Sequence, residues 1–175
     1  MLRIGIDFDN TIVDYRPIFA AAVPGMSAGK TSVRDALRAR PDGEAEWQRL
    51  QAHVYGIAIA DAPAFPGFDA FLQTARAKAA GIYIVSHKSR FAAADPEGRD
   101  LRAAASNWLT AHRIDVDGVY FEGTRAEKLA RIADLHLTHF IDDLEDVLLD
   151  AAFPKETRAI LFEDSWDAVQ RDVFG

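Results

Sequence analysis

Short apolar runs rich in β-branched residues alternate along this chain with segments whose apolar residues recur at helical spacing. The runs cover residues 2–8, 82–85, 116–121, 139–141 and 158–162, and the helical patterns cover residues 68–79, 101–112, 129–133, 144–151 and 166–173. Strands that alternate with helices at this spacing predict parallel βαβ units. We therefore expect an α/β fold with a doubly wound, mostly parallel sheet of Rossmann-like type.

Residues 14–64 interrupt this alternation. They contain no strand pattern, and helical patterns at 17–23, 33–39 and 44–54 are separated by segments that contain proline and glycine. We expect a core domain formed by residues 1–13 and 65–175, with a small α-helical insertion at residues 14–64. Residues 25–31 look like a phosphate-binding P-loop, but only three residues separate the two glycines and no strand precedes them, which argues against that interpretation.

Composition excludes several classes of protein. The 175-residue chain has a formal net charge of −7, whereas a nucleic-acid-binding surface is basic. It has no cysteine, and therefore no disulfide and no thiolate metal site. It also has neither an apolar run long enough to span a membrane nor the apolar run of a signal peptide at its start. We expect a soluble cytoplasmic protein that binds neither nucleic acid nor membrane.

The segment Asp7-Phe8-Asp9-Asn10-Thr11 directly follows the first predicted strand. Strand alternation places Asp7 and Asp9 on one side. Two adjacent carboxylates repel each other unless a divalent cation or a shared proton offsets their charge. One carboxylate could attack as a nucleophile while the other moves a proton. The alternative is an acidic turn that caps the next segment, because Asp and Asn are common turn residues.

Polar residues also follow the second predicted strand. Ser86 closes residues 82–85, and His87 and Lys88 come next. A hydroxyl at the carboxyl end of a neighbouring strand can bind a ligand oxygen in the same crevice as Asp7. Each residue has a simpler explanation, because serine often caps a helix or turn and a basic loop residue is often solvated.

Lys128 lies in the first turn of a predicted helix. Thr124 and Glu127 match a capping box, which fixes the start of that helix. A cation is unfavourable there because of the helix dipole, and an anion or carboxylate in front of the helix would explain it. The alternative is a surface lysine that costs only a few tenths of a kcal/mol.

A second acidic pair, Asp142-Asp143, follows the predicted strand at residues 139–141. Carboxylates at the ends of two strands suit a hard cation, which prefers oxygen ligands. In the alternative interpretation, Asp143 caps the next helix and Asp142 has no role at a site.

In this order, these residues resemble the four motifs of the haloacid dehalogenase superfamily, which consists mostly of phosphatases. The motifs are Asp-x-Asp-x-Thr, a Ser or Thr after an apolar strand, a Lys near a helix start and an acidic pair after a strand. The matching residues are Asp7, Asp9 and Thr11, then Ser86, then Lys128, then Asp142 and Asp143. Asn10 stands where the family frequently has Gly, and residues 14–64 resemble the helical cap that the family inserts after its first motif.

The resemblance implies a Mg²⁺-dependent phosphatase that acts on a small phosphorylated substrate. Asp7 would be the nucleophile, and Asp9 would protonate the leaving oxygen and then activate water. The residues implied to bind phosphate or substrate are Asn10, Thr11, Ser86, His87 and Lys128. The residues implied to hold the metal are Asp7, Asp9 (through its backbone carbonyl), Asp142 and Asp143. An acid at position 9 favours phosphate esters over haloacids, because a dehalogenase has no leaving alkoxide to protonate.

Three other functions fit the same residues. A phosphomutase uses the same chemistry and differs in its product. A phospho-accepting receiver also arranges acids, a hydroxyl and a Lys around Mg²⁺, although the insertion and a nucleophile on the first strand argue against it. An inert binding module is the third, and the acid at Asp9 argues against it.

Overall fold

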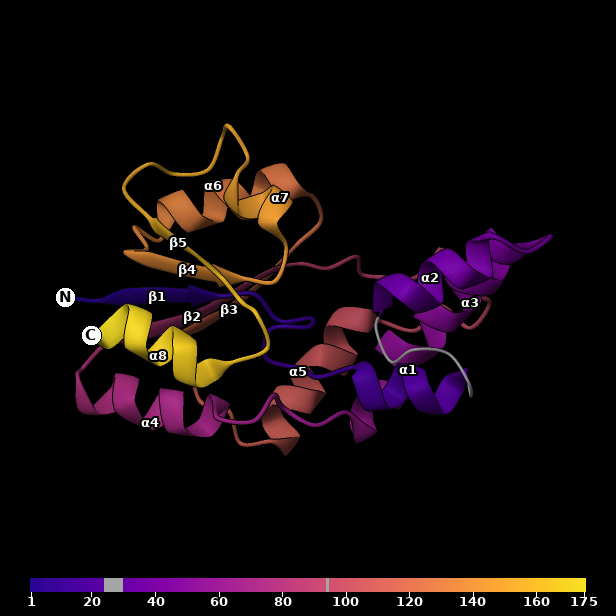
Figure 1. The fold of residues 1–175 in the computed structure, drawn as a ribbon, viewed down its shortest axis with the longest axis horizontal. Helices are drawn as coiled ribbons and strands as arrows, with labels where there is room; N and C mark the ends of the chain where they lie inside the picture. The colour runs from indigo at the N-terminus through magenta and orange to yellow at the C-terminus, as the bar shows by residue number, and fades with distance from the viewer. Residues whose placement is uncertain (24–29, 94) are drawn as a thin grey trace. The chain divides into compact units, whose positions relative to one another are not determined.

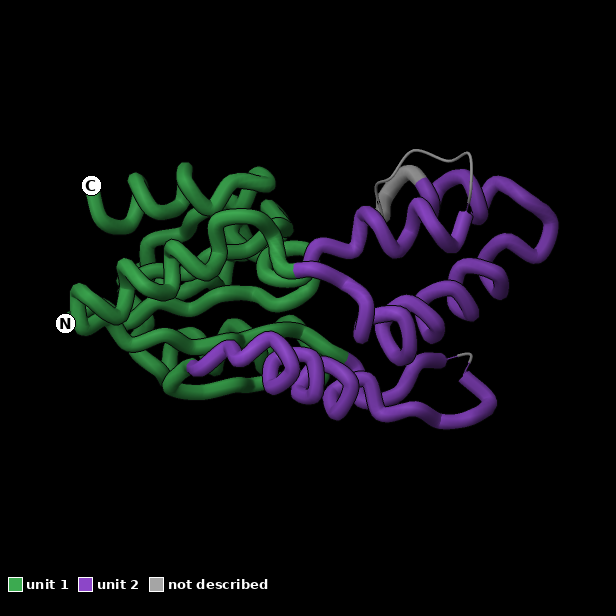
Figure 2. Tube along the Cα trace, turned by 90° about the horizontal axis from the view of Figure 1, so that it is seen from below, with its two compact units in different colours: residues 1–13, 64–88, 116–175 green, residues 14–63, 89–115 purple. Residues whose placement is uncertain are grey.

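The computed structural model describes residues 1–23, 30–93 and 95–175. The chain divides into two compact units, coloured separately in Figure 2. Unit 1 consists of Met1–Val13, Ala64–Lys88 and Val116–Gly175, and unit 2 consists of Asp14–Pro63 and Ser89–Asp115. Most of the segment that resembles a P-loop, residues 25–31, lies outside the described residues.

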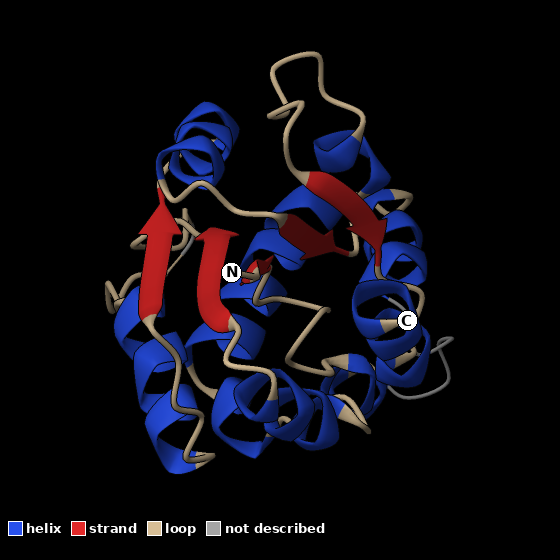
Figure 3. Ribbon diagram, turned by 90° about the vertical axis from the view of Figure 1, so that its left-hand side faces the viewer, coloured by secondary structure: helices blue, strands red, loops and turns tan. Residues whose placement is uncertain are grey.

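Unit 1 is built on a five-stranded sheet in the order β3-β2-β1-β4-β5. Every pair of neighbouring strands in it is parallel, and the strands are drawn in red in Figure 3. Their bounds are β1 Arg3–Ile6, β2 Gly81–His87, β3 Gly118–Glu122, β4 His139–Asp142 and β5 Arg158–Leu161. The predicted α/β fold with a doubly wound parallel sheet is confirmed. The strand order runs outward in both directions from β1, so the carboxyl ends of β1 and its two neighbours meet at one edge.

Helices cover both faces of this sheet (Figure 1). One face carries α6 (Arg125–Asp134) and α7 (Glu145–Leu148), and the other carries α4 (Phe68–Ala77) and α8 (Trp166–Phe174). Beneath α6 and α7, a buried apolar cluster consists of Val85, Leu129, Ile132, Leu137, Phe140, Val147 and Leu148. On the other face, the Trp166 ring lies 4.8 Å from those of both Phe68 and Phe71. These two layers hold the strand ends in a fixed arrangement.

Unit 2 is helical. Its elements are α1 (Arg16–Ala22), α2 (Lys30–Arg38), α3 (Gly43–Gly56), the 3₁₀ helix η1 (Ala58–Asp61) and α5 (Leu101–Ala111). Aromatic contacts join α1 to α3: Phe19 stacks on Trp47 at a ring separation of 6.0 Å. Trp108 of α5 donates a 2.8 Å hydrogen bond to the backbone carbonyl of Ala62. Residues 89–115, which follow β2 in the chain, therefore pack with residues 14–63.

No helix in the described part of the chain combines the length and apolarity that a membrane-spanning helix needs.

Candidate active site

Three neighbouring strands bring polar side chains to one edge of the sheet in unit 1. Asp7 directly follows β1, Ser86 lies near the end of β2, and Asp142 ends β4. The Asp7 N–H donates a 2.8 Å hydrogen bond to the carbonyl of Ile141, so the pairing of β1 with β4 continues to this point. This backbone pairing holds Asp7 of the first motif beside Asp142 of the fourth motif. Ligands of open α/β sheets bind at this edge.

Lys128 connects two of these carboxylates. Its Nζ lies 2.6 Å from Asp7 Oδ1 and 2.6 Å from Asp142 Oδ2. The lysine is only 1% exposed, so the alternative of a solvated surface lysine is wrong. A buried ammonium of this kind requires charged partners, and the two aspartates provide them.

The start of α6 explains why Lys128 lies there. Thr124 Oγ1 accepts a hydrogen bond from the Glu127 N–H at 3.1 Å, as the predicted capping box requires. The Glu127 side chain accepts from the N–H of Gly123 at 3.0 Å, one residue before the N-cap. The first turn of α6 is thereby fixed, and the side chain of Lys128 reaches the ends of β1 and β4.

The protonation of this cluster is shifted by its burial. Burial raises the pKa of Asp7 from 3.8 to about 6; the charges of Asp142 and Asp9 act in the same direction, and Lys128 opposes them. Burial disfavours the Lys128 ammonium, but Asp7 and Asp142 outweigh it and raise the pKa of Lys128 above 10.5. Lys128 is therefore a permanent cation beside a carboxylate that is costly to ionise.

The acidic residues fit a divalent cation. Carboxylate oxygens of Asp7, Asp142 and Asp143 all lie within 4.8 Å of one another. Two of these residues are buried and Asp143 is half-buried. The single charge of the Lys128 ammonium, which contacts Asp7 and Asp142, cannot balance three negative charges. An all-oxygen donor set with excess negative charge suits Mg²⁺.

The Asp9 carboxylate is directed to a different cation. Lys88 Nζ lies 2.9 Å from Asp9 Oδ1 and 2.9 Å from Oδ2. Lys88 is only 4% exposed, although the sequence offered solvation as its simplest explanation. The signal that could have identified it is strand alternation, because Lys88 follows Ser86 by two residues and so lies on the same side.

The loop after Asp9 is a tight turn. Asn10 has a φ of 60°, a conformation that asparagine adopts more readily than most residues, and its N–H donates to the Val13 carbonyl at 3.1 Å. Thr11 is fully buried, and its hydroxyl has no hydrogen-bond partner among the described residues. Among the described residues, the hydrogen bonds of Lys128 go to Asp7 and Asp142, and neither the Asn10 N–H nor the Thr11 hydroxyl takes part in them.

Ser86 and His87 have contrasting environments. Ser86 is 1% exposed and pairs in register with Phe121 of β3. His87 is exposed, and its Nε2 lies 3.0 Å from the carbonyl of Gly123. Ser86 is thus fixed at the site edge, whereas the His87 ring contacts the backbone that precedes α6.

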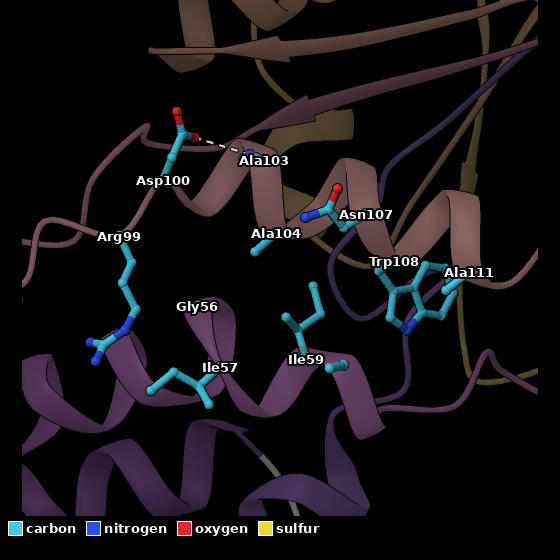
Figure 4. A pocket seen from close by; sticks show the side chains of 11 residues that line it. Gly56, Ile57, Ile59, Arg99, Asp100, Ala103, Ala104, Asn107, Trp108 and Ala111 are labelled. Carbon is cyan, nitrogen blue, oxygen red and sulfur yellow. Dashed lines mark hydrogen bonds between the residues drawn. The ribbon is translucent and has the colours of Figure 1, made fainter.

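Unit 2 contains a separate cavity of about 470 Å³, shown in Figure 4. It lies between the end of α3 with η1 on one side and α5 on the other. Its lining is mostly apolar, with Ile57, Ile59 and Trp108, and Arg99, Asp100 and Asn107 supply polar groups. None of the site residues predicted from the sequence lines it.

The cluster in unit 1 can support attack by a carboxylate on an electrophile that carries negative charge. A buried cation holds the Asp7 carboxylate at 2.6 Å, and a second acid, Asp9, lies two residues away. Preorganised charges of this kind stabilise charge that develops in a transition state.

Comparisons with known proteins place this arrangement in a known fold. Neither the family models nor the curated proteins gave a match. Among solved structures, a haloacid dehalogenase-like hydrolase from Streptococcus pneumoniae is 16% identical with a TM-score of 0.61, over 99% of this chain and 91% of that one. A subfamily IA hydrolase of the same superfamily from Geobacter sulfurreducens is 14% identical with a TM-score of 0.56, over 100% and 97%.

A predicted phosphoglycolate phosphatase from Haemophilus somnus is 16% identical with a TM-score of 0.56, over 90% of this chain and 83% of that one. These identities are low, and the likeness establishes the fold. The chain has the haloacid dehalogenase fold, as its motifs predicted.

Proposed function

We propose that this protein is a Mg²⁺-dependent phosphomonoester hydrolase that acts on a small phosphorylated metabolite through an aspartyl-phosphate intermediate. The observation that carries the proposal is the buried contact of Lys128 with both Asp7 and Asp142. A carboxylate held beside a buried cation at the ligand-binding edge of the sheet is suited to attack a phosphoryl group. The fold shared with hydrolases of the haloacid dehalogenase superfamily supports the same function.

In the first step, a carboxylate oxygen of Asp7 forms a bond to phosphorus as the bond to the leaving oxygen breaks. Asp9 gives its proton to that oxygen, and the alcohol leaves. In the second step, Asp9 takes a proton from water, whose oxygen attacks phosphorus. The acyl phosphate bond breaks, phosphate leaves, and the Asp7 carboxylate is restored. Phosphoryl transfer depends mainly on positioning and charge stabilisation, which the cluster supplies.

The metal would be held by the carboxylates of Asp7, Asp142 and Asp143, with the backbone carbonyl of Asp9 as a further oxygen ligand. When bound, Mg²⁺ supplies positive charge that offsets both the carboxylates and the phosphoryl oxygens. Lys128, which lies in α6 and contacts Asp7 and Asp142, would neutralise part of the same negative charge.

The remaining predicted residues would bind the phosphoryl group or the substrate. Ser86 is suited to this role by its burial at the strand end. The Asn10 N–H would have to exchange its bond to Val13 for a phosphoryl oxygen. His87 and Thr11 remain candidates, with His87 the more accessible of the two.

Residues 14–64 are proposed to be a cap that contributes to substrate choice. Residues 14–63 of this segment form one compact unit with residues 89–115, so the unit that would carry substrate-selecting residues includes α5.

The decisive experiment measures phosphate release from p-nitrophenyl phosphate and from a panel of phosphorylated metabolites, with excess Mg²⁺. Phosphoglycolate belongs in the panel because of the solved structure described under that name. Stoichiometric release of phosphate and alcohol is expected. An isomeric phosphate ester as the product would instead identify a phosphomutase, and a single phosphorylation without turnover would identify a receiver.

Removal of the metal is expected to abolish turnover and lower stability. Mg²⁺ at about 100 times its Kd should stabilise the folded protein by about 2.7 kcal/mol, because it binds the native cluster. Ca²⁺ should inhibit, because it accepts looser and higher coordination and would misplace Asp7. Thermal unfolding and turnover with Mg²⁺, Ca²⁺ and chelator provide the measurements. Asp142→Asn should remove most of the thermal shift, and full activity in excess chelator would exclude the metal role.

Replacing Asp9 by asparagine is expected to slow the hydrolysis of an alkyl phosphate far more than the hydrolysis of p-nitrophenyl phosphate. General acid–base catalysis contributes about 10²- to 10⁴-fold, and a poor leaving group depends on it most. Single-turnover kinetics with both substrates isolate the first step. Asp69→Asn, an exposed acid in the first turn of α4, serves as the matched control. Equal losses for the two leaving groups would contradict the assigned role of Asp9.

A further inference from the structure

Lys88 contacts both oxygens of the Asp9 carboxylate, and this contact has no counterpart among the four sequence motifs. Both Nζ–oxygen distances are 2.9 Å. The Lys88 side chain is 4% exposed and that of Asp9 is 18% exposed. The ion pair is therefore largely shielded from solvent, unlike the surface pairs that contribute little.

The backbone and the side chain of Lys88 are both held in place. Its N–H donates to the Glu122 carbonyl at 2.9 Å, which extends the pairing of β2 with β3 by one residue. Its ammonium lies 5.4 Å from the centre of the Phe8 ring, within the range of a cation–π interaction. The Lys88 side chain thus extends from the end of β2, past the Phe8 ring, to the carboxylate of Asp9.

Asp9 needs such a restraint. It lies beyond the last residue of β1, immediately before the turn at Asn10, so its side chain is oriented by contacts outside the strand. A proton donor must lie within hydrogen-bond reach of the leaving oxygen, and small displacements of catalytic groups have large effects on rate. A cation that touches both carboxylate oxygens limits rotation about the side-chain bonds.

We propose that Lys88 is a positioning residue that acts on catalysis through Asp9, by orienting its carboxylate toward the leaving group. This inference rests on the proposed phosphatase function. Lys128 contacts Asp7 and Asp142, whereas Lys88 contacts both oxygens of Asp9. Their variants should therefore differ in kinetics.

The test compares Lys88→Met and Lys88→Arg with wild type on an alkyl phosphate and on p-nitrophenyl phosphate. Lys88→Met is expected to lower kcat for the alkyl phosphate by about 10- to 100-fold, part of the contribution of a general acid, and to affect p-nitrophenyl phosphate much less. Lys88→Arg keeps the charge and should recover part of the loss. Lys78→Met is the matched control, because Lys78 is exposed just after α4, close to the amino end of β2.

A double variant separates positioning from direct substrate binding. In an Asp9→Asn background, Lys88→Met is expected to cause little further loss, because the carboxylate that it orients is already absent. Inhibition by vanadate, a phosphate mimic, should be unchanged in Lys88→Met. Thermal unfolding identifies a folding failure, in which case Lys88→Gln takes the place of the Met variant in both comparisons.

Three results would overturn the positioning role while leaving the phosphatase intact. These are equal losses with both substrates, full additivity with Asp9→Asn, and weakened vanadate inhibition. Wild-type protein that hydrolyses neither substrate with Mg²⁺ would instead overturn the proposed function itself.

Discussion

Asp7→Asn is expected to reduce phosphomonoester turnover by a factor on the order of 10⁴ or more while leaving the protein folded. An amide is nearly isosteric with the carboxylate but does not attack phosphorus effectively. The Asp7 backbone would keep its 2.8 Å hydrogen bond to Ile141, and burial already raises the pKa of the native carboxyl to about 6. Burial already disfavours the Asp7 charge, and Lys128 keeps Asp142 as a charged partner in the variant, so the protein should remain folded.

The measurement is steady-state turnover of p-nitrophenyl phosphate by purified variant and wild type, with thermal unfolding of both. Asp69→Asn again provides an acid-to-amide change outside the site. Mass spectrometry of protein trapped with substrate should show an added phosphoryl group in wild type and none in Asp7→Asn. Activity within tenfold of wild type would exclude Asp7 as the nucleophile.

The sheet could be predicted because its signals are local. Each apolar run became a strand within a residue or two at its ends, as with residues 82–85 and β2 (Gly81–His87). Parallel pairing followed from the alternation of strands with helices, since parallel strands need a crossover connection. The position of Asp7 and Asp142 at one edge then followed from that topology.

Contacts between distant segments could not be predicted in the same way. The sequence left two environments open for Lys128, one facing an anion or carboxylate and one on the surface. The packing of α6 against the sheet buries it. Lys88 and Asp9 are 79 residues apart in the chain, and no local pattern joins them. The packing of residues 89–115 with residues 14–63 likewise depends on contacts such as that of Trp108 with Ala62.

Lys128→Met is expected to lower the free energy of unfolding by about 3–5 kcal/mol in chelator, because removing one partner leaves buried charge uncompensated. The methionine keeps most of the apolar stem, so the loss reports the ammonium that contacts Asp7 and Asp142. Turnover of alkyl and aryl phosphates should fall by similar factors, because Lys128 balances charge on the phosphoryl group and does not act on the leaving group. Vanadate inhibition should weaken as well, in contrast to Lys88→Met.

Metal and lysine neutralise the same carboxylates, so their effects on stability should be coupled. Mg²⁺ is therefore expected to stabilise Lys128→Met by more than it stabilises wild type, provided that the acidic cluster remains assembled. Denaturant unfolding of both proteins, with Mg²⁺ and with chelator, gives this coupling as a difference of differences. Lys78→Met controls for loss of a surface charge. An unchanged unfolding free energy for Lys128→Met in chelator would mean that the two carboxylates are neutralised by protonation, and that the lysine is not the charge that holds the cluster together.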